Sequence, residues 1–67
     1  MDGASIREIR RSQGMTQEKF AEAVGTSRFM VNRWEAGIHR PNLESLKKIA
    51  RATGKTLREV VDEVAGG

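Results

Sequence analysis

The stretch TQEKFAEAVGTSRFMVNRWEAG, residues 16–37, decides the fold of this chain. Thr16 and Ser27 each precede a segment with helical apolar spacing, where a hydroxyl side chain caps the first turn of a helix. Gly25 lies between the two segments and accepts the positive φ that a tight turn needs. Ala21 is the small residue that a close approach of two helices requires. The stretch therefore predicts two short helices that meet at roughly 90–120°, which is a helix-turn-helix.

The second helix of this motif has one apolar side, formed by Met30, Val31 and Trp34. Val31 and Trp34 are expected to anchor the helix to the body of the protein. Because the indole of Trp34 shares the apolar spacing, we interpret it as a core residue and not as a stacking platform for a base. The opposite side of the same helix is then turned outward.

Apolar residues on both sides of the motif recur with a period near 3.6 and nowhere alternate by two, so only helices are expected. Ahead of the motif, Ser5 and Glu8 have the spacing of a capping box, which predicts that Ser5 caps a first helix. Ile6 and Ile9 supply its inner side, and Gly14 is expected to end it.

Two further helices are expected after the motif. The residue before Pro41 is disfavoured in the helical conformation, so residues 38–41 are predicted to form a loop. Asn42 is the expected cap of a fourth helix, and Thr56 with Glu59 forms a capping box that opens a fifth. The side chains expected to face inward on these helices are Leu43, Leu46, Ile49, Ala50, Leu57, Val60 and Val64.

The chain has 67 residues and no cysteine, which suits one domain without disulfides. A domain of this size buries only about 60% of the surface of its unfolded chain, so it has little room for a substrate cavity. The expected architecture is all-α, a compact five-helix bundle over residues 1–67 with the helix-turn-helix at about 16–36. Residues 1–4 and 65–67 are expected to be frayed.

Positive charge is concentrated in the middle of the chain. Twelve Lys and Arg against nine Asp and Glu give a net charge of +3. Residues 28–40 contain a single acid, Glu35, whereas residues 57–64 are mainly acidic. This distribution is consistent with a polyanionic partner for the middle segment. The basic candidates there are Arg28, Arg33, His39 and Arg40.

The residues of the motif resemble a known family. Met15–Ala21, Gly25–Ser27 and Val31–Gly37 are similar to the lambda-repressor-like, Cro-type or Xre-type helix-turn-helix family, and the likeness covers nearly the whole chain. The resemblance implies a third helix that enters the major groove of double-stranded DNA. It also implies a small, sequence-specific transcriptional regulator, expected to be a repressor. Further matching positions are Pro41, Leu46, Ile49, Ala50 and Gly54, whereas Thr53 stands where a larger aliphatic residue is usual.

The family's functional positions carry over residue by residue. Gln17 matches the position that grips a backbone phosphate at a helix start, and Thr16 is a phosphate candidate beside it. Arg40 and His39 match the loop that follows the DNA backbone. Arg10 and Glu35 match a pair that joins the first helix to the third. The exposed positions of the reading helix correspond to Ser27, Arg28, Phe29, Asn32 and Arg33.

Each reading candidate also has a simpler interpretation. Arg28 and Arg33 suit guanine O6 and N7, at roughly 1–3 kcal/mol of discrimination each, or they are solvated arginines or phosphate contacts. Asn32 suits adenine, or is an ordinary polar surface residue. Ser27 is a helix cap first. Phe29 cannot hydrogen-bond a base edge, so it contacts either a thymine methyl or a partner protein.

Catalysis and metal binding find no support in the sequence. His39 is the only histidine and has no carboxylate cluster beside it, so no metal site, catalytic residue, cofactor or small-molecule substrate is expected. The apolar runs are too short to cross a bilayer, and the N-terminus lacks the pattern of a signal peptide. The expected location is the cytoplasm of a prokaryotic or phage-infected cell, at the nucleoid.

We expect a homodimer on DNA, since one small module contacts few bases and two half-sites lie about one helical turn apart. Val61 on the last helix is the candidate to face a second copy. Two alternatives remain open. In the first, the chain would be a protein-interaction module that uses Phe29 and Met30. In the second, it would be an antitoxin component, although it has no spare segment to wrap a toxin.

Overall fold

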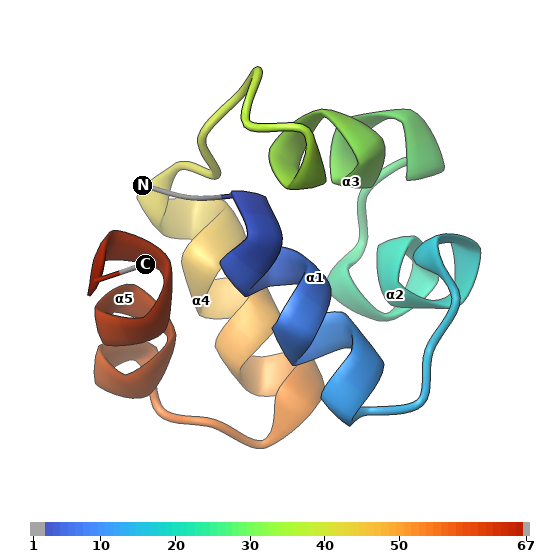
Figure 1. Cartoon of the computed structure of the whole chain (residues 1–67). Helices are drawn as coiled ribbons and strands as arrows, with labels where there is room; N and C mark the ends of the chain where they lie inside the picture. The colour runs from blue at the N-terminus through green and yellow to red at the C-terminus, as the bar shows by residue number, and fades with distance from the viewer. Residues whose placement is uncertain (1–2, 67) are drawn as a thin grey trace.

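The computed structural model describes residues 3–66, with side chains described for residues 5–64. Within this range the chain forms five helices and no strand (Figure 1). The all-α, five-helix prediction is confirmed, and the helix-turn-helix is formed by the second and third helices. The frayed ends expected at 1–4 and 65–67 lie partly outside the described residues. The helices are α1 (Gly3–Ser12), α2 (Gln17–Val24), α3 (Arg28–Glu35), α4 (Leu43–Thr53) and α5 (Leu57–Gly66).

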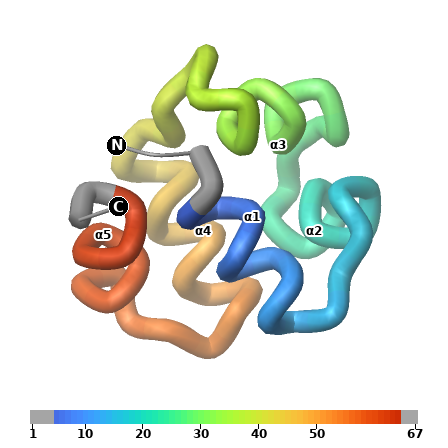
Figure 2. The backbone as a smooth tube through the Cα atoms, in the orientation of Figure 1, coloured from blue at the N-terminus to red at the C-terminus, as the bar shows by residue number. Residues whose placement is uncertain are grey.

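The helices surround a single core, with α1 and α4 between α5 on one side and the α2–α3 pair on the other (Figure 1). The backbone trace in Figure 2 shows that the segment joining α3 to α4 stays at the same end of the molecule as α3. The outward side of α3 carries exposed residues, and so do residues 36–40 of this segment.

Polar side chains fix the starts of three helices where the sequence predicts caps. The oxygen of Thr16 accepts a hydrogen bond from the backbone N–H of Lys19 at 3.1 Å, and that of Ser27 accepts one from Met30 at 3.1 Å. Asn42 caps α4 in the same way, at 2.8 Å. Each such cap stabilises its helix by about 1 kcal/mol. These contacts set the first residue of α3, and with it the register of the side chains that α3 presents.

The prediction that Ser5 and Glu8 form a capping box at the start of the first helix is wrong. α1 begins at Gly3, so Ser5 lies inside its first turn and is half-buried. The spacing of a capping box also places two side chains one turn apart inside a helix, so the pattern does not fix the first residue. By contrast, Thr56 and Glu59 form the predicted box ahead of α5, with reciprocal bonds of 2.9 and 3.1 Å.

The turn between α2 and α3 depends on Gly25, which has a φ of 84°. Its N–H donates to the carbonyl of Ala21 at 2.8 Å, and the N–H of Thr26 donates to the same oxygen at 2.9 Å. The two bonds close α2 and turn the chain directly into the cap of α3. An added Cβ on Gly25 would meet no atom within 4 Å, so backbone conformation and not space selects glycine here.

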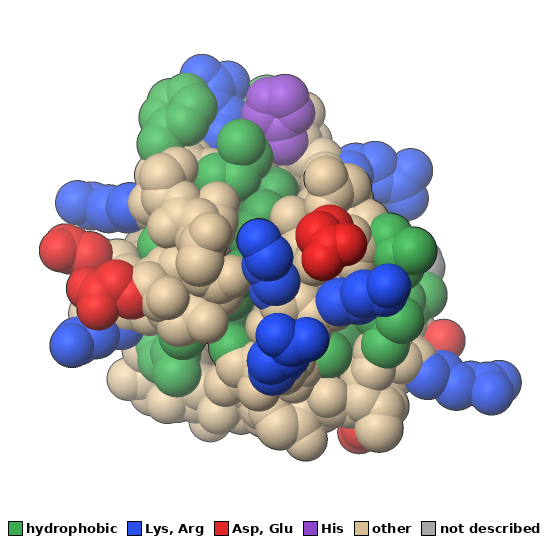
Figure 3. Space-filling model, turned by 180° about the vertical axis from the view of Figure 1, so that it is seen from behind, with side chains coloured by type: hydrophobic (Ala, Val, Ile, Leu, Met, Phe, Trp, Pro, Cys, Tyr) green, Lys and Arg blue, Asp and Glu red, His purple; other side chains and the backbone are tan. Residues whose placement is uncertain are grey.

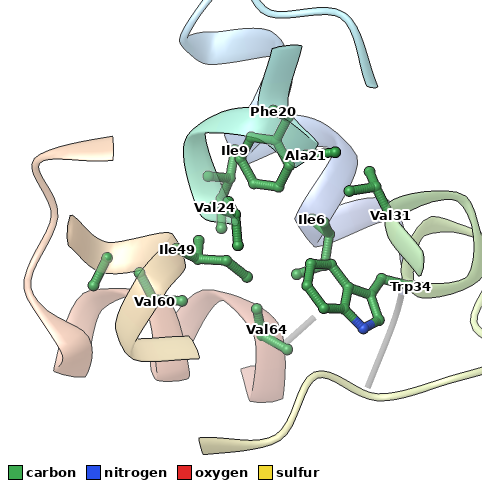
Figure 4. Packing of buried hydrophobic residues seen from close by; sticks show 11 residues of the cluster. Ile6, Ile9, Phe20, Ala21, Val24, Val31, Trp34, Ile49, Val60 and Val64 are labelled. Atoms are coloured by element: carbon green, nitrogen blue, oxygen red, sulfur yellow. The ribbon is translucent and has the colours of Figure 1, made fainter. Parts of the chain in front are cut away.

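The core is made of apolar side chains from all five helices, and Figure 4 shows them converging. Phe20, Val31 and Trp34 have exposed fractions of 2% or less, so α2 and α3 are both anchored in it. The complete set is Ile6, Ile9, Phe20, Ala21, Val24, Val31, Trp34, Ile49, Ala50, Val60 and Val64.

Among the inward positions expected on α4 and α5, Leu43 is wrong, and Leu46 and Leu57 are only half-buried. Leu43 is 58% exposed, because Pro41 is the buried residue ahead of α4 and the inward side of that helix begins only at Leu46. Leu57, at the first position of α5, is half-buried. Thr53 is buried in place of a larger aliphatic residue, and its hydroxyl donates to the carbonyl of Ile49 at 2.8 Å, so it leaves no unpaired polar group.

Candidate nucleic-acid interface

One side of α3 faces away from the molecule and carries the side chains expected to read bases. Arg28, Phe29 and Asn32 are exposed and Arg33 is partly exposed, whereas Val31 and Trp34 on the other side are buried. Positions 28, 29, 32 and 33 share one helix face because they are one turn apart in pairs. Ser27, exposed at the start of the helix, is occupied as its cap. The structure thus brings all five reading candidates to one surface.

A buried carboxylate holds α3 in place. Glu35 is 5% exposed, and its Oε2 accepts a bond from Arg10 Nε at 2.6 Å while its Oε1 accepts one from Arg10 Nη2 at 3.1 Å. Arg10 also donates to the carbonyl of Met15 at 2.9 Å. The two residues that the resemblance pairs therefore join α1, α3 and the segment before α2.

Two further donors complete this carboxylate's surroundings. Arg7 Nε and Gln17 Nε2 donate to Glu35 Oε1 at 3.3 and 3.2 Å. Burial acts to raise the pKa of Glu35, but the hydrogen bonds from Arg10 and Gln17 and the charge of Arg10 outweigh it, so the pKa lies below its usual value. Sequence reasoning missed Arg7, although its place one turn before Arg10 on the same helix is a signal that was available.

The side chain of Gln17 is not oriented as a direct contact with a DNA phosphate would require. Its amide nitrogen donates inward to Glu35 and its side chain is half-buried, so that end of the amide is not free at the surface. Next to it is an open hollow of about 400 Å³ between α1 and the starts of α2 and α3. The side chains that border the hollow are Arg10, Thr16, Gln17, Glu18 and Arg28.

Arg33 does not extend straight into solvent. Its Cζ lies 4.5 Å from the centroid of the Phe29 ring, so the guanidinium rests over an aromatic face that is otherwise exposed. Phe29 is 61% exposed. A cation–π contact at an exposed site stabilises by about 0.5–1 kcal/mol, which orients the side chain without locking it. The i, i+4 spacing of the two residues is a signal of this contact that sequence reasoning did not use.

The segment after α3 follows the end of that helix closely. The N–H groups of Ile38 and His39 both donate to the carbonyl of Arg33, at 3.0 and 3.3 Å. His39 and Arg40 are exposed on this segment. Figure 3 shows the single histidine at one end of the molecule, close to a hydrophobic and a basic side chain. The two loop candidates thus lie just after the last turn of α3, whereas Thr16 and Gln17 lie at the start of α2.

A family model described as helix-turn-helix matches residues 6–60, which includes all of the geometry above. The chain belongs to the helix-turn-helix family. This confirms the resemblance to the Cro or Xre type. DNA binding in transcription regulation is accordingly the function class of this helix-turn-helix domain.

Three relatives of the chain are described as transcriptional regulators. The HTH-type transcriptional activator BcrR of Enterococcus faecalis is 36% identical over 56 residues, which are 84% of this chain and 28% of BcrR. An uncharacterized HTH-type transcriptional regulator of Methanothermobacter thermautotrophicus is 41% identical over 59 residues, covering 88% of this chain and 81% of that protein. The cryptic phage CTXphi transcriptional repressor RstR of Vibrio cholerae is 29% identical over 63 residues, covering 94% of this chain and 57% of RstR.

The helix-turn-helix domain thus spans about a quarter of one of these relatives, over half of another and most of the third. No solved structure is significantly similar to the chain.

A second basic surface of the helix-turn-helix domain lies on α4 and was not expected from the sequence. Lys47, Lys48 and Arg51 are all exposed, at positions that share one helix face. Lys48 and Arg51 border a hollow of about 220 Å³ beside Gly25 at the end of α2. Figure 3 shows basic side chains gathered near the middle of the face seen from behind, away from the end that carries the histidine.

The described part of the helix-turn-helix domain holds no group of three or more His, Cys, Asp or Glu side chains suited to a metal ion. Among its described helices, none combines the length and the apolar character that a membrane span requires.

Proposed function

We propose that this domain binds double-stranded DNA sequence-specifically, as a homodimer with α3 in the major groove, and acts as a transcriptional repressor. The observation that carries the proposal is the two-sided character of α3. One side is fixed by Val31, Trp34 and the buried Glu35, and the other presents exposed polar and aromatic side chains. A rigid helix with a free outward side fits the width of the major groove, about 12 Å.

The outward side of α3 supplies the base-reading groups. Arg28 and Arg33 each present a planar set of N–H donors that matches O6 and N7 of guanine, and Asn32 matches N6 and N7 of adenine. Ser27 caps the helix, and its exposed position at the helix start supports a further contact with the DNA. Phe29 contributes an apolar surface in the same row.

Phosphate contacts are proposed at the start of α2 and on the loop after α3. Thr16 and Gln17 stand at the start of α2, whose unpaired N–H groups attract an anion, and the adjoining hollow has Arg28 on its edge. With its amide nitrogen bonded to Glu35, Gln17 holds the start of α2 in place, and the backbone N–H groups there carry the phosphate. After α3, His39 and Arg40 are exposed on the loop whose backbone N–H groups donate to the carbonyl of Arg33.

Two copies would bind half-sites about one helical turn, ~34 Å, apart. Val61 on α5 is the candidate for the contact between copies, since it is only half-buried within one copy. A dimer on an operator represses by excluding other proteins from the same DNA. We further propose that the chain has no enzymatic activity and acts in the cytoplasm at the nucleoid, where its DNA is.

The test is selection of bound sequences from a random duplex pool. The affinity for the selected duplex is then measured at about 50 and 200 mM salt. The proposal expects a short palindrome and an affinity that falls steeply with salt, because bound phosphates release counterions. Arg58→Ala controls for the loss of one positive charge, because Arg58 is exposed on α5. This variant should retain the sequence preference of the wild type. Weak binding to every duplex, with no recovered motif, would overturn the proposal.

A second candidate function is protein interaction, alone or as an antitoxin component. It is favoured by three exposed apolar side chains: Phe29 at 61%, Ile38 at 60% and Leu43 at 58%. Association through such a surface would depend little on salt, so the same salt series separates the two functions.

A further inference from the structure

We propose that Phe29 and Arg33 act together as one reading unit, which recognises a guanine with a pyrimidine 5-methyl group on the adjacent base pair. The inference rests on the proposed DNA binding and names the dinucleotide chemistry that this part of α3 selects. The methyl group is that of thymine or of 5-methylcytosine, since the major groove presents the same C5-methyl in both.

The spacing of the two side chains suits neighbouring base pairs. Arg33 Cζ lies 4.5 Å from the centroid of the Phe29 ring. This separation is close to the rise between successive bases of a DNA strand, ~3.4 Å. With this contact directed along the DNA axis, a guanidinium at the level of one base pair sets the ring at the level of the next.

The contact leaves the hydrogen-bonding groups of Arg33 available. A cation–π contact is an attraction to the ring face and provides no hydrogen-bond acceptor of the kind that a carbonyl or carboxylate offers, so the N–H donors of Arg33 remain available. Within the part of the chain that the structure describes, Glu35 is paired with Arg7 and Arg10, and no carboxylate pairs with Arg33. The ring thus holds the guanidinium ready for guanine O6 and N7 without occupying the atoms that bind them.

The ring restricts what the neighbouring base pair can be. A phenyl group neither donates nor accepts a hydrogen bond, and most of the Phe29 ring is exposed, with a 61% exposed fraction. In the major groove the 5-methyl group of a pyrimidine is the apolar feature of the base edges. A cytosine without the methyl presents only a C5–H at this place, so the ring loses the apolar contact.

Arg28 provides an internal comparison. It is also exposed on α3, but among the described residues no aromatic ring lies against its guanidinium. A guanine read by Arg28 is therefore expected to show no dependence on the 5-methyl group of its neighbour.

The experiment uses the duplex recovered by selection, with the thymine beside the Arg33-contacted guanine replaced by deoxyuridine, which removes only the methyl group. Wild-type affinity should fall about fourfold, as expected for one methyl-sized group returned to water. Phe29→Ala should bind the thymine and deoxyuridine duplexes equally and still prefer guanine. Because Phe29 is exposed, this variant should keep the helical circular dichroism of the wild type.

Two more duplexes separate the sources of the methyl group. They carry cytosine or 5-methylcytosine at the same position, opposite guanine. Recovery of tight binding by 5-methylcytosine supports recognition of either methyl, and tight binding to thymine alone supports thymine.

Equal wild-type binding to thymine and deoxyuridine would overturn the inference, as would a methyl preference that persists in Phe29→Ala. If either result is obtained while binding remains sequence-specific, the proposed function is not contradicted. If no duplex is bound specifically, the proposed function and the inference both fail.

Discussion

Arg10 Nε donates to Glu35 Oε2 over 2.6 Å, and this contact joins α1 to the last residue of α3. The Glu35 side chain is 1% exposed and that of Arg10 is 12% exposed, so the pair is largely shielded from water. A helix that reads DNA must keep a fixed distance and angle to the rest of the domain. The pair supplies this constraint from the side of α3 that faces away from the proposed groove.

Replacing Arg10→Met should destabilise the domain by about 3–5 kcal/mol, because it leaves a buried carboxylate without its main partner. The measurement is urea unfolding followed by circular dichroism. Arg7→Met is the matched control, since the Arg7 side chain is 44% exposed and lies 3.3 Å from the same carboxylate. The control should cost less than about 1 kcal/mol. Equal losses in the two variants would show that Arg10 has no special role.

The stability of the domain should fall in acid through Glu35. Its folded pKa is lowered, so between the unfolded value of about 4.3 and the folded value the unfolded state binds more protons. The stabilisation is therefore fully present above pH ~4.3 and is lost as the pH falls through the folded pKa. Thermal unfolding between pH 7 and pH 2.5 measures this dependence. Glu35→Gln should unfold at a lower temperature at pH 7, and its unfolding temperature should depend less on pH in acid. An acid dependence equal to that of the wild type would contradict the role of Glu35.

Gly25→Ala should destabilise the domain by roughly 1–2 kcal/mol, the cost of a left-handed conformation for a residue with a Cβ. The φ of 84° is the only obstacle, because the added Cβ would contact nothing within 4 Å. Gly25→Asn is the comparison, since asparagine adopts this conformation more readily, and it should cost less than alanine. If both variants are as stable as the wild type, the turn has another basis. Chemical denaturation gives the difference directly.

Arg28→Ala should weaken binding to the selected DNA by about 5- to 150-fold, corresponding to roughly 1–3 kcal/mol for a lost guanine contact. It should also relax the base preference at one position in each half-site. Arg51→Ala removes the same charge from the exposed side of α4 and should preserve the preference. Fluorescence anisotropy with matched and mismatched duplexes distinguishes the two. A uniform loss on every duplex would instead make Arg28 a phosphate contact.

The fold follows closely from the sequence because its signals are local. The caps at Thr16, Ser27 and Asn42 bond to backbone groups three residues away, so the pattern itself contains both partners. The first residue of α1 was misplaced because the spacing of Ser5 and Glu8 is compatible with the interior of a helix as well as its start.

The side-chain contacts at the site depend on residues far apart in the chain. Gln17 turns inward to Glu35, and Arg7 joins the same carboxylate, because folding brings α1, α2 and α3 together around it. No local sequence pattern indicates that these side chains come together around Glu35. The contact of Arg33 with Phe29 is local, but the sequence alone does not tell whether the guanidinium rests on the ring or extends into solvent.

The central claim is that α3 reads base edges in the major groove. It is tested most directly by replacing each guanine of the selected duplex in turn with 7-deazaguanine, which removes the N7 acceptor and keeps Watson–Crick pairing. We predict that one such replacement weakens wild-type binding about tenfold and has no further effect on Arg33→Ala, because that variant has already lost the contact. Wild-type binding that is unchanged by every replacement would contradict major-groove reading by α3.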